Sequence, residues 1–266
     1  MKNYQKWQKN KNYLGSSETI CETSINNIWW FIGFTEGNGS FIRSNNRLYF
    51  IINQKNPLVL YKIKSILGIG KISKYNNYYR YILTKQEHIL FLIYIFNGRL
   101  LLNKTNIIFK EWLLLLNIDY IYNDYNSFTL NNAWLSGFID AEGYFNADIV
   151  NIKDNNSLNI HLKFTIDQKN ELNILKKIKE KFNCGYIEHN MWRFVLNANK
   201  NQCIVIDYLD KFKLKGIKNV NYIKFKRLWN KLNLKQNINI KSIKIERRLR
   251  NLVKTLNKID EDRVQN

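Results

Sequence analysis

Two short apolar segments far apart in the chain share one pattern. Residues 28–35 and 133–139 are almost continuously apolar, and each predicts a buried helix. Each segment contains a glycine, Gly33 or Gly137, which costs a helix about 1 kcal/mol relative to alanine. The same cost at the same position in both segments predicts that the two helices pack with their backbones in close contact.

After each apolar segment the pattern changes to an alternation of apolar and polar residues. Residues 158–166 place an apolar side chain at every second position, which predicts a strand with one buried and one polar face. A similar hairpin is expected around Arg43 and Arg47 in the first half. Further helices are expected at 57–67, 89–96, 104–117, 171–182, 204–212 and 220–232, and second hairpins at 68–83 and 185–196. The predicted fold class is therefore α+β, with helix, hairpin, helix, hairpin, helix and helix in each half.

Short repeated motifs confirm that the chain contains an internal duplication. Gln54-Lys55-Asn56 recurs as Gln168-Lys169-Asn170, and Tyr79-Arg80-Tyr81-Ile82-Leu83 recurs as Trp192-Arg193-Phe194-Val195-Leu196. The same number of residues separates Gln54 from Lys104 and Gln168 from Lys218. The second half has a longer segment before its glutamine, which predicts a longer first hairpin. We expect an N-terminal arm (1–24), a first half (25–117), a linker (118–131), a second half (132–235) and a basic C-terminal tail (236–266).

Charge indicates the kind of partner. The chain of 266 residues has 42 Lys and Arg against 21 Asp and Glu, a formal net charge of +21. Such an excess is typical of proteins that bind nucleic acid, although a solvated basic surface or a codon bias would also raise the lysine content. The three cysteines are scattered and fit neither a disulfide framework nor a zinc site. We expect no membrane-spanning helix, because no apolar run is long enough.

The two apolar segments end in motifs that resemble a known family. Phe31-Ile32-Gly33-Phe34-Thr35-Glu36-Gly37-Asn38-Gly39 and Leu135-Ser136-Gly137-Phe138-Ile139-Asp140-Ala141-Glu142-Gly143 are similar to the motif of the LAGLIDADG homing endonucleases and intron maturases. The resemblance implies a monomer with two αββαββα-type halves related by a pseudo-twofold axis. Its antiparallel sheets are expected to form a saddle over double-stranded DNA.

The resemblance also implies catalytic roles for matched residues in the two halves. These residues are Asn38, Glu142, Gln54, Gln168, Lys104 and Lys218. A divalent metal ion, usually Mg²⁺, is expected to bind at Glu142 and Asn38, with the carbonyls of Gly37 and Ala141 beside it. The family usually has an acid where this chain has Asn38. An amide carries no negative charge, so metal affinity is expected to be lower.

Two other matched acids, Glu36 and Asp140, lie two residues before the metal positions and are expected to be structural. Nucleic-acid contacts are expected from basic residues on the strands, because Arg and Lys favour guanine and phosphate. The candidates are Arg43, Arg47, Arg80, Lys153, Lys163 and Arg193. A basic helix at 241–258 is a further candidate for contact with the phosphate backbone, with a solvated surface helix as the alternative.

Three functions are consistent with these features. The first is a site-specific endonuclease that cleaves double-stranded DNA and promotes intron homing. The second is a maturase that binds its group I intron RNA and assists splicing without cleaving DNA. The third is a DNA-binding protein or nickase with an impaired active centre, and Asn38 favours the second and third. The composition, rich in Lys, Asn and Ile, suggests an organellar gene and a mitochondrial location.

Overall fold

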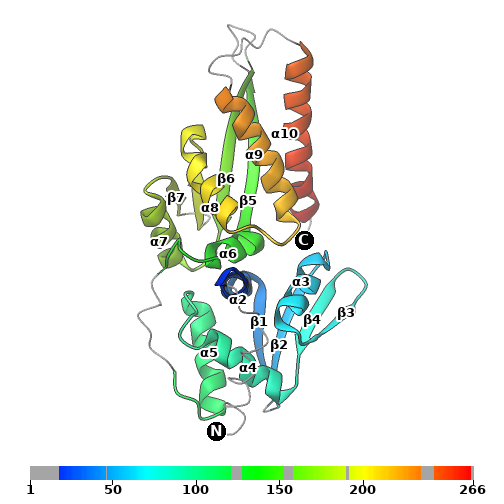
Figure 1. Cartoon of the computed structure of the whole chain (residues 1–266), viewed down its shortest axis with the longest axis vertical. Coiled ribbons are helices and arrows are strands. Elements are labelled where there is room, and N and C mark those ends of the chain that lie inside the picture. The colour runs from blue at the N-terminus through cyan, green and yellow to red at the C-terminus, as the bar shows by residue number, and fades with distance from the viewer. Residues whose placement is uncertain are drawn as a thin grey trace.

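The computed structural model describes residues 18–45, 47–120, 128–151, 158–189, 192–234 and 243–264. Two halves lie one above the other along the long axis, with helices α2 (Glu18–Asn38) and α6 (Trp134–Glu142) between them (Figure 1). α2 begins within the segment that was expected to be an N-terminal arm. Of the expected linker, residues 121–127 lie outside the described residues.

Each half has the element order that the sequence predicts. The first half continues with β1 (Gly39–Ser44), β2 (Arg47–Gln54), α3 (Leu58–Leu67), β3 (Lys71–Lys74), β4 (Tyr79–Leu83), α4 (Gln86–Phe96) and α5 (Asn103–Leu115). The second continues with β5 (Gly143–Asn151), β6 (Leu158–Asp167), α7 (Leu172–Phe182), β7 (Tyr186–Glu188), β8 (Arg193–Leu196), α8 (Gln202–Lys211), α9 (Lys218–Leu234) and α10 (Ile243–Val264). The predicted α+β class and the duplication are confirmed.

The two sheets have the same topology. Their strand orders are β1-β2-β4-β3 and β5-β6-β8-β7, and every described pair of neighbours is antiparallel. β5 and β6 have 9 and 10 residues, against 6 and 8 in β1 and β2, in agreement with a longer first hairpin in the second half. The candidate Lys153 lies in this hairpin but outside the described residues.

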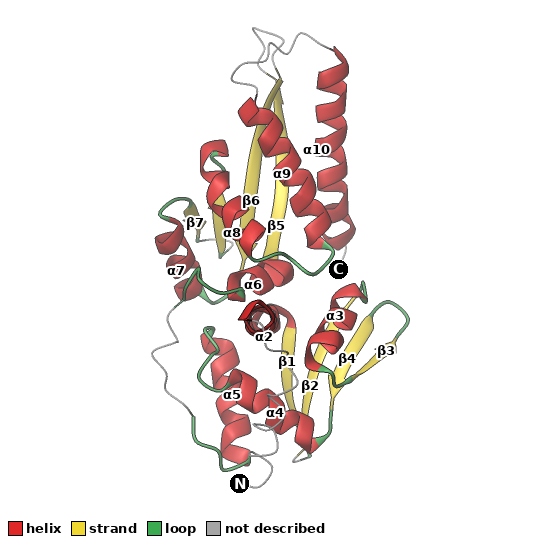
Figure 2. Cartoon of the chain, viewed as in Figure 1, coloured by secondary structure: helices red, strands yellow, loops and turns green. Residues whose placement is uncertain are grey.

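Helices cover one face of each sheet and leave the other face open (Figure 2). The covered faces are built from aromatic side chains, since Phe41 packs edge-on against Phe50 and Trp112, and Phe145 packs against Phe164 and Phe225. All but Phe41, which is 7% exposed, are at most 1% exposed. The open faces carry the alternate residues of the same strands, among them the basic residues Arg47, Arg80, Lys163 and Arg193.

The C-terminal helix α10 is part of the second half. It packs on β5 and α9 and buries Leu249, Val253 and Leu256, which recur at helical spacing on an otherwise charged segment. The boundary expected at residue 235 is therefore too early. Within the described residues, no helix is long and apolar enough to span a membrane.

An asparagine from α10 protects the edge of the second sheet. The side-chain amide of Asn257 accepts a hydrogen bond from the backbone N–H of Ala147 at 3.2 Å and donates one to the Ala147 carbonyl at 2.9 Å. Ala147 lies in β5, which is the edge strand of its sheet. Asn257 thus takes the place of a neighbouring strand at this position, where unpaired backbone groups would otherwise invite association with another chain.

Candidate active site at the junction of the halves

The helices α2 and α6 touch backbone to backbone at their glycines. A Cβ atom on Gly33 would collide with the carbonyl oxygen of Trp134, and one on Gly137 would collide with the carbonyl oxygen of Trp30. The contact is reciprocal, as expected for two copies of one motif related by a twofold axis. It confirms the prediction that both glycines serve the close approach of two helices.

The acids Glu36 and Asp140 are anchored across the same interface. Glu36 accepts a hydrogen bond from the indole N–H of Trp134 at 2.7 Å, and Asp140 accepts one from the indole N–H of Trp30 at 2.9 Å. Each acid also accepts two backbone N–H groups from its own half, from Leu101 and Leu102 for Glu36. For Asp140 the donors are Lys215 and Gly216.

These bonds give both acids a structural role. Both side chains are buried, at 2% and 6% exposure. Their hydrogen bonds described above are all to N–H groups of the protein. Burial raises the pKa of Glu36 to about 7, against the lowering effect of its three N–H donors. Because the carboxyl group of Glu36 faces Trp134 and the loop before α5, it is committed to these donors and is not available as a metal ligand.

The two residues that the sequence suggests as metal ligands lie at the carboxyl ends of the paired helices. Asn38 is the last residue of α2 and Glu142 the last residue of α6. Both line a cavity of about 410 Å³ at the junction of the halves, together with Gln54 and Tyr144. The sequence repeat thus brings Asn38, Glu142 and Gln54 to one site, where oxygen donors from both halves converge.

Two lysines act on the Glu142 carboxylate. Burial raises the pKa of Glu142 above its ordinary value, and the positive charges of Lys218 and Lys104 oppose this effect. Lys218 is 3% exposed, and its ammonium group donates to the carbonyl of Ala141 at 2.7 Å and to that of Ile139 at 3.3 Å. Since these carbonyls end α6, Lys218 fixes the helix end that carries Glu142 and is favourably placed at the negative end of the helix dipole.

The matched residues of the two halves are not in equivalent surroundings. Gln54 lines the cavity, whereas Gln168 is 3% exposed and its backbone N–H bonds the carbonyl of Trp192 at 2.9 Å. Lys104 is exposed, whereas Lys218 is buried. The backbone N–H of Lys104 donates to the carboxylate of Glu171, a residue of the other half, at 2.6 Å.

The basic candidates of the first half lie on both faces of its sheet. Arg43 pairs with Leu48 in the β1–β2 register and therefore shares the covered face with Phe41. Arg47 and Arg80 lie on the open face, where a nucleic acid would be contacted. The sequence alone does not separate these cases, because the strand bounds decide which face each residue takes.

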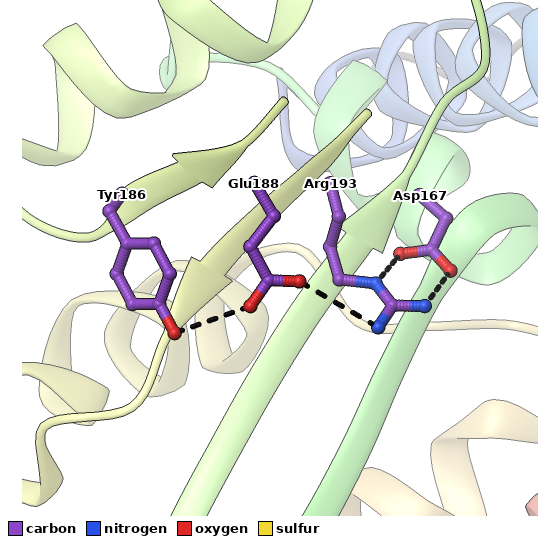
Figure 3. A network of polar contacts seen from close by, with 4 residues as sticks. All are labelled: Asp167, Tyr186, Glu188 and Arg193. Atoms are coloured by element: carbon purple, nitrogen blue, oxygen red, sulfur yellow. Dashed lines mark hydrogen bonds and ion pairs between the residues drawn. The ribbon is translucent and has the colours of Figure 1, made fainter. Parts of the chain in front are cut away.

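In the second half, Lys163 and Arg193 lie on the open face. Lys163 is partly buried on β6, opposite Asn146. The guanidinium of Arg193 forms a two-pronged ion pair with Asp167, one bond of which is 2.7 Å, and lies 4.0 Å from Glu188 (Figure 3). Arg193 is thus held by two carboxylates of its own sheet.

Sequence reasoning missed several residues that build this region. Trp30 and Trp134 each precede a motif acid by the same spacing, and that repetition is a signal that they have a shared role. Glu171 and Asp167 are found only in the structure, because their partners Lys104 and Arg193 are distant in the sequence.

A comparison with models of protein families identifies the family of this chain. A model described as LAGLIDADG endonuclease matches residues 31–116 and 135–229, one match for each half. The chain belongs to this family. The Neurospora crassa protein named "Probable intron-encoded endonuclease 4" is 33% identical over 217 residues, which are 76% of this chain and 39% of that LAGLIDADG relative.

Other relatives have names that refer to introns. An "Uncharacterized cox1 intron-2 37.2 kDa protein" of Schizosaccharomyces pombe is 26% identical over 75% of this chain and 64% of its own length. "Intron-encoded RNA maturase bI4" of Saccharomyces cerevisiae is 30% identical over 44% of this chain and 19% of its own length. The LAGLIDADG chain described here thus spans less than two thirds of each of these relatives.

Solved structures show the same LAGLIDADG fold. The structure of I-SmaMI bound to an uncleaved DNA target in the presence of calcium ions matches with a TM-score of 0.72 at 17% identity. The match covers 86% of this chain and 98% of I-SmaMI. I-AabMI bound to uncleaved DNA matches with a TM-score of 0.67 at 19% identity and covers 85% of this chain and 98% of its own.

Proposed function

We propose that this protein is a site-specific endonuclease that hydrolyses phosphodiester bonds of double-stranded DNA with a divalent metal ion, and that it promotes intron homing. The observation that carries the proposal is the convergence of Glu142 and Asn38 at the ends of two backbone-packed helices, between two open sheet faces. The two motifs pair within one chain, so a monomer suffices for the complete site.

The donor set at the junction fits Mg²⁺, although weakly. Glu142 provides a carboxylate, and Asn38 and Gln54 provide amide oxygens, all around the same cavity. Mg²⁺ is commonly held by one or two carboxylates together with substrate phosphates and water. Within the described residues there is no group of three or more His, Cys, Asp or Glu side chains that could hold a metal without such help.

Glu142 and Asn38 would hold the metal, with the carbonyl of Gly37 beside them. When bound, the metal would supply an activated water and neutralise charge on the phosphate. The carbonyl of Ala141 accepts the hydrogen bond of Lys218, so its contribution is to fix the helix end. Lys218 and Lys104 favour the ionised form of Glu142 and bring positive charge to a position where negative charge develops on the phosphate.

Asn38→Asp tests the proposal most directly. We expect this variant to cleave intron-minus DNA with Mg²⁺ at least 10-fold faster than the unchanged protein, because it restores a second negative charge to the metal site. Glu142→Gln should abolish cleavage and leave DNA binding intact. Equal cleavage by the unchanged and Asn38→Asp proteins would show that residue 38 does not limit the reaction, and loss of binding in Glu142→Gln would give Glu142 a structural role.

A second candidate function is favoured by Asn38 and by the likeness to the bI4 maturase over 44% of this chain. A maturase needs no strand cleavage, so the loss of one acid would be tolerated. In this case the protein would bind its group I intron RNA and accelerate splicing. Faster splicing of that RNA by the unchanged protein, with no DNA cleavage by either protein, would favour this function.

The cellular location follows from the relatives. Several of them are named as intron-encoded, and another is named for a cox1 intron. We propose that the present gene lies in an organellar intron and that the protein acts in the mitochondrion. Detection of the protein in purified mitochondria by a specific antibody would test this location, and its absence from them would contradict it.

A further inference from the structure

Among the described residues, the open face of the first sheet has a net positive charge and that of the second a net negative charge. Strand alternation places three basic residues on the open face of the first sheet, and none of its described residues is acidic. These basic residues are Arg47, Lys71 and Arg80. Among its described residues, the open face of the second sheet carries two basic residues, Lys163 and Arg193, and three acidic ones. These acidic residues are Asp148, Asp167 and Glu188.

One pair of equivalent positions accounts for one charge of this difference. Asn53 lies opposite Arg80 in the first sheet, and Asp167 lies opposite Arg193 in the second. Both pairs make the same bond, in which the Nε–H of the arginine donates to the side-chain oxygen of its partner. An amide in one half thus replaces a carboxylate in the other.

The surroundings of Arg80 leave its positive charge uncompensated. Its Nε is 2.9 Å from the Asn53 side-chain oxygen, and its Nη2 donates to the Tyr78 hydroxyl at 3.1 Å. The guanidinium lies 4.9 Å from the ring centre of Tyr75 and 5.5 Å from that of Tyr78, and these two rings are stacked on each other. These partners are uncharged, and they hold the guanidinium in place on the open face.

The surroundings of Arg193 compensate its charge more than fully. Asp167 binds the guanidinium with both oxygens, and Glu188 lies 4.0 Å away on its other side, where it also accepts from the Tyr186 hydroxyl at 3.4 Å (Figure 3). The side chains of Arg193, Asp167 and Glu188 are between 23% and 30% exposed. A phosphate that approached Arg193 would have to displace a carboxylate or lie beside it.

From these contacts we propose that the first sheet provides most of the electrostatic attraction to the DNA backbone, and that the second sheet contacts the DNA with its charge neutralised by the Asp167–Arg193–Glu188 cluster. This inference rests on the proposed function, because it takes double-stranded DNA as the ligand. Arg193 is then a residue that positions two carboxylates, and those carboxylates present acceptors to base amino groups such as cytosine N4.

Exchange of the partner residues between the halves tests the proposal. A fluorescein-labelled DNA duplex of mixed sequence is titrated with protein at salt concentrations from about 50 to 200 mM, and the slope of log affinity against log salt is measured. Asp167→Asn should leave Arg193 with an amide partner, as Arg80 has, beside the single carboxylate of Glu188, and should steepen the slope by up to about 0.9, the value for one additional phosphate contact. Asn53→Asp should neutralise Arg80 and flatten the slope by a similar amount.

The control is Glu180→Gln, which makes the same charge change as Asp167→Asn on the exposed surface of α7. A steeper slope in Asp167→Asn than in Glu180→Gln supports the proposal. Equal slopes in these two variants, or an unchanged slope in Asn53→Asp, overturn it while leaving DNA binding itself intact. Failure of the unchanged protein to bind the duplex at low salt would instead contradict the proposed function, and the inference with it.

Discussion

The indole N–H of Trp134 donates to the carboxylate of Glu36 at 2.7 Å and so joins the two halves inside their interface. Trp112 is equally buried, but its indole N–H has no hydrogen-bond partner among the described residues. At pH 8, where Glu36 with its pKa of about 7 is ionised, Trp134→Phe should therefore lower the free energy of unfolding by about 1.5–3 kcal/mol more than Trp112→Phe, the range for a hydrogen bond to a charged group. Denaturant unfolding of both variants measures the difference, and equal losses would contradict the role of this bond.

The glycine contact makes a second prediction. Gly33→Ala places a methyl group against the Trp134 carbonyl, which belongs to a rigid helix backbone, so we expect a loss of about 3 kcal/mol or more. Ser136→Ala is the matched control on α6, because the Ser136 hydroxyl is buried without a partner in the described structure. Thermal unfolding should show a large fall in Tm for Gly33→Ala and little change for Ser136→Ala. A tolerated Gly33→Ala would mean that the helices can separate at low cost.

The raised pKa of Glu36 predicts how stability depends on pH. Burial raises this pKa from 4.5 to about 7 in the folded state, so the folded protein binds the proton more tightly than the unfolded chain. Its contribution to stability is then complete below about pH 4.5 and is lost as the pH rises through about 7. Relative to Glu36→Gln, the unchanged protein should lose about 2–3 kcal/mol between pH 5 and 8. Parallel stability curves for the two proteins would show that the carboxyl group does not titrate in this range.

The edge protection by Asn257 can be tested in the same way. Asn257→Ala leaves the N–H and carbonyl of Ala147 without their partner and should cost about 1–3 kcal/mol. Asn251→Ala, at an exposed position of the same helix, should cost little. Unfolding in denaturant compares the two, and light scattering reports whether the exposed strand edge promotes association. Equal stability would indicate that water replaces the Asn257 amide without loss.

The sequence predicts the paired helices and the structural role of Glu36 and Asp140 because both are local features repeated in two motifs. It does not predict the donors of Glu36, since Trp134 lies in the other half and the bond exists only when the helices cross at their glycines. The ion pair between Arg193 and Asp167 cannot be predicted from the sequence for a similar reason. Whether an arginine on a strand faces a phosphate or a carboxylate depends on the register, which brings Asp167 opposite Arg193.

The boundary error at α10 has a different cause. Lys and Arg are frequent in this segment, and the buried apolar residues Leu249, Val253 and Leu256 are interspersed with polar and charged ones. The helical periodicity of the apolar positions is a weaker signal than this charge excess. The structure resolves the ambiguity because the apolar stripe meets the covered side of β5 and α9.

The two reciprocal tryptophan bonds have different acceptors: Trp134 donates to a glutamate of the first half and Trp30 to an aspartate of the second, and these acidic side chains differ in length. The interface of each half is therefore complementary to the other half and not to an identical copy. After an ancestral gene is duplicated and fused, this complementarity favours pairing of the two halves within one molecule. One copy can then carry an amide, as at Asn38, while the other carries a carboxylate, as at Glu142, and a permanently asymmetric protein can evolve from a symmetric plan.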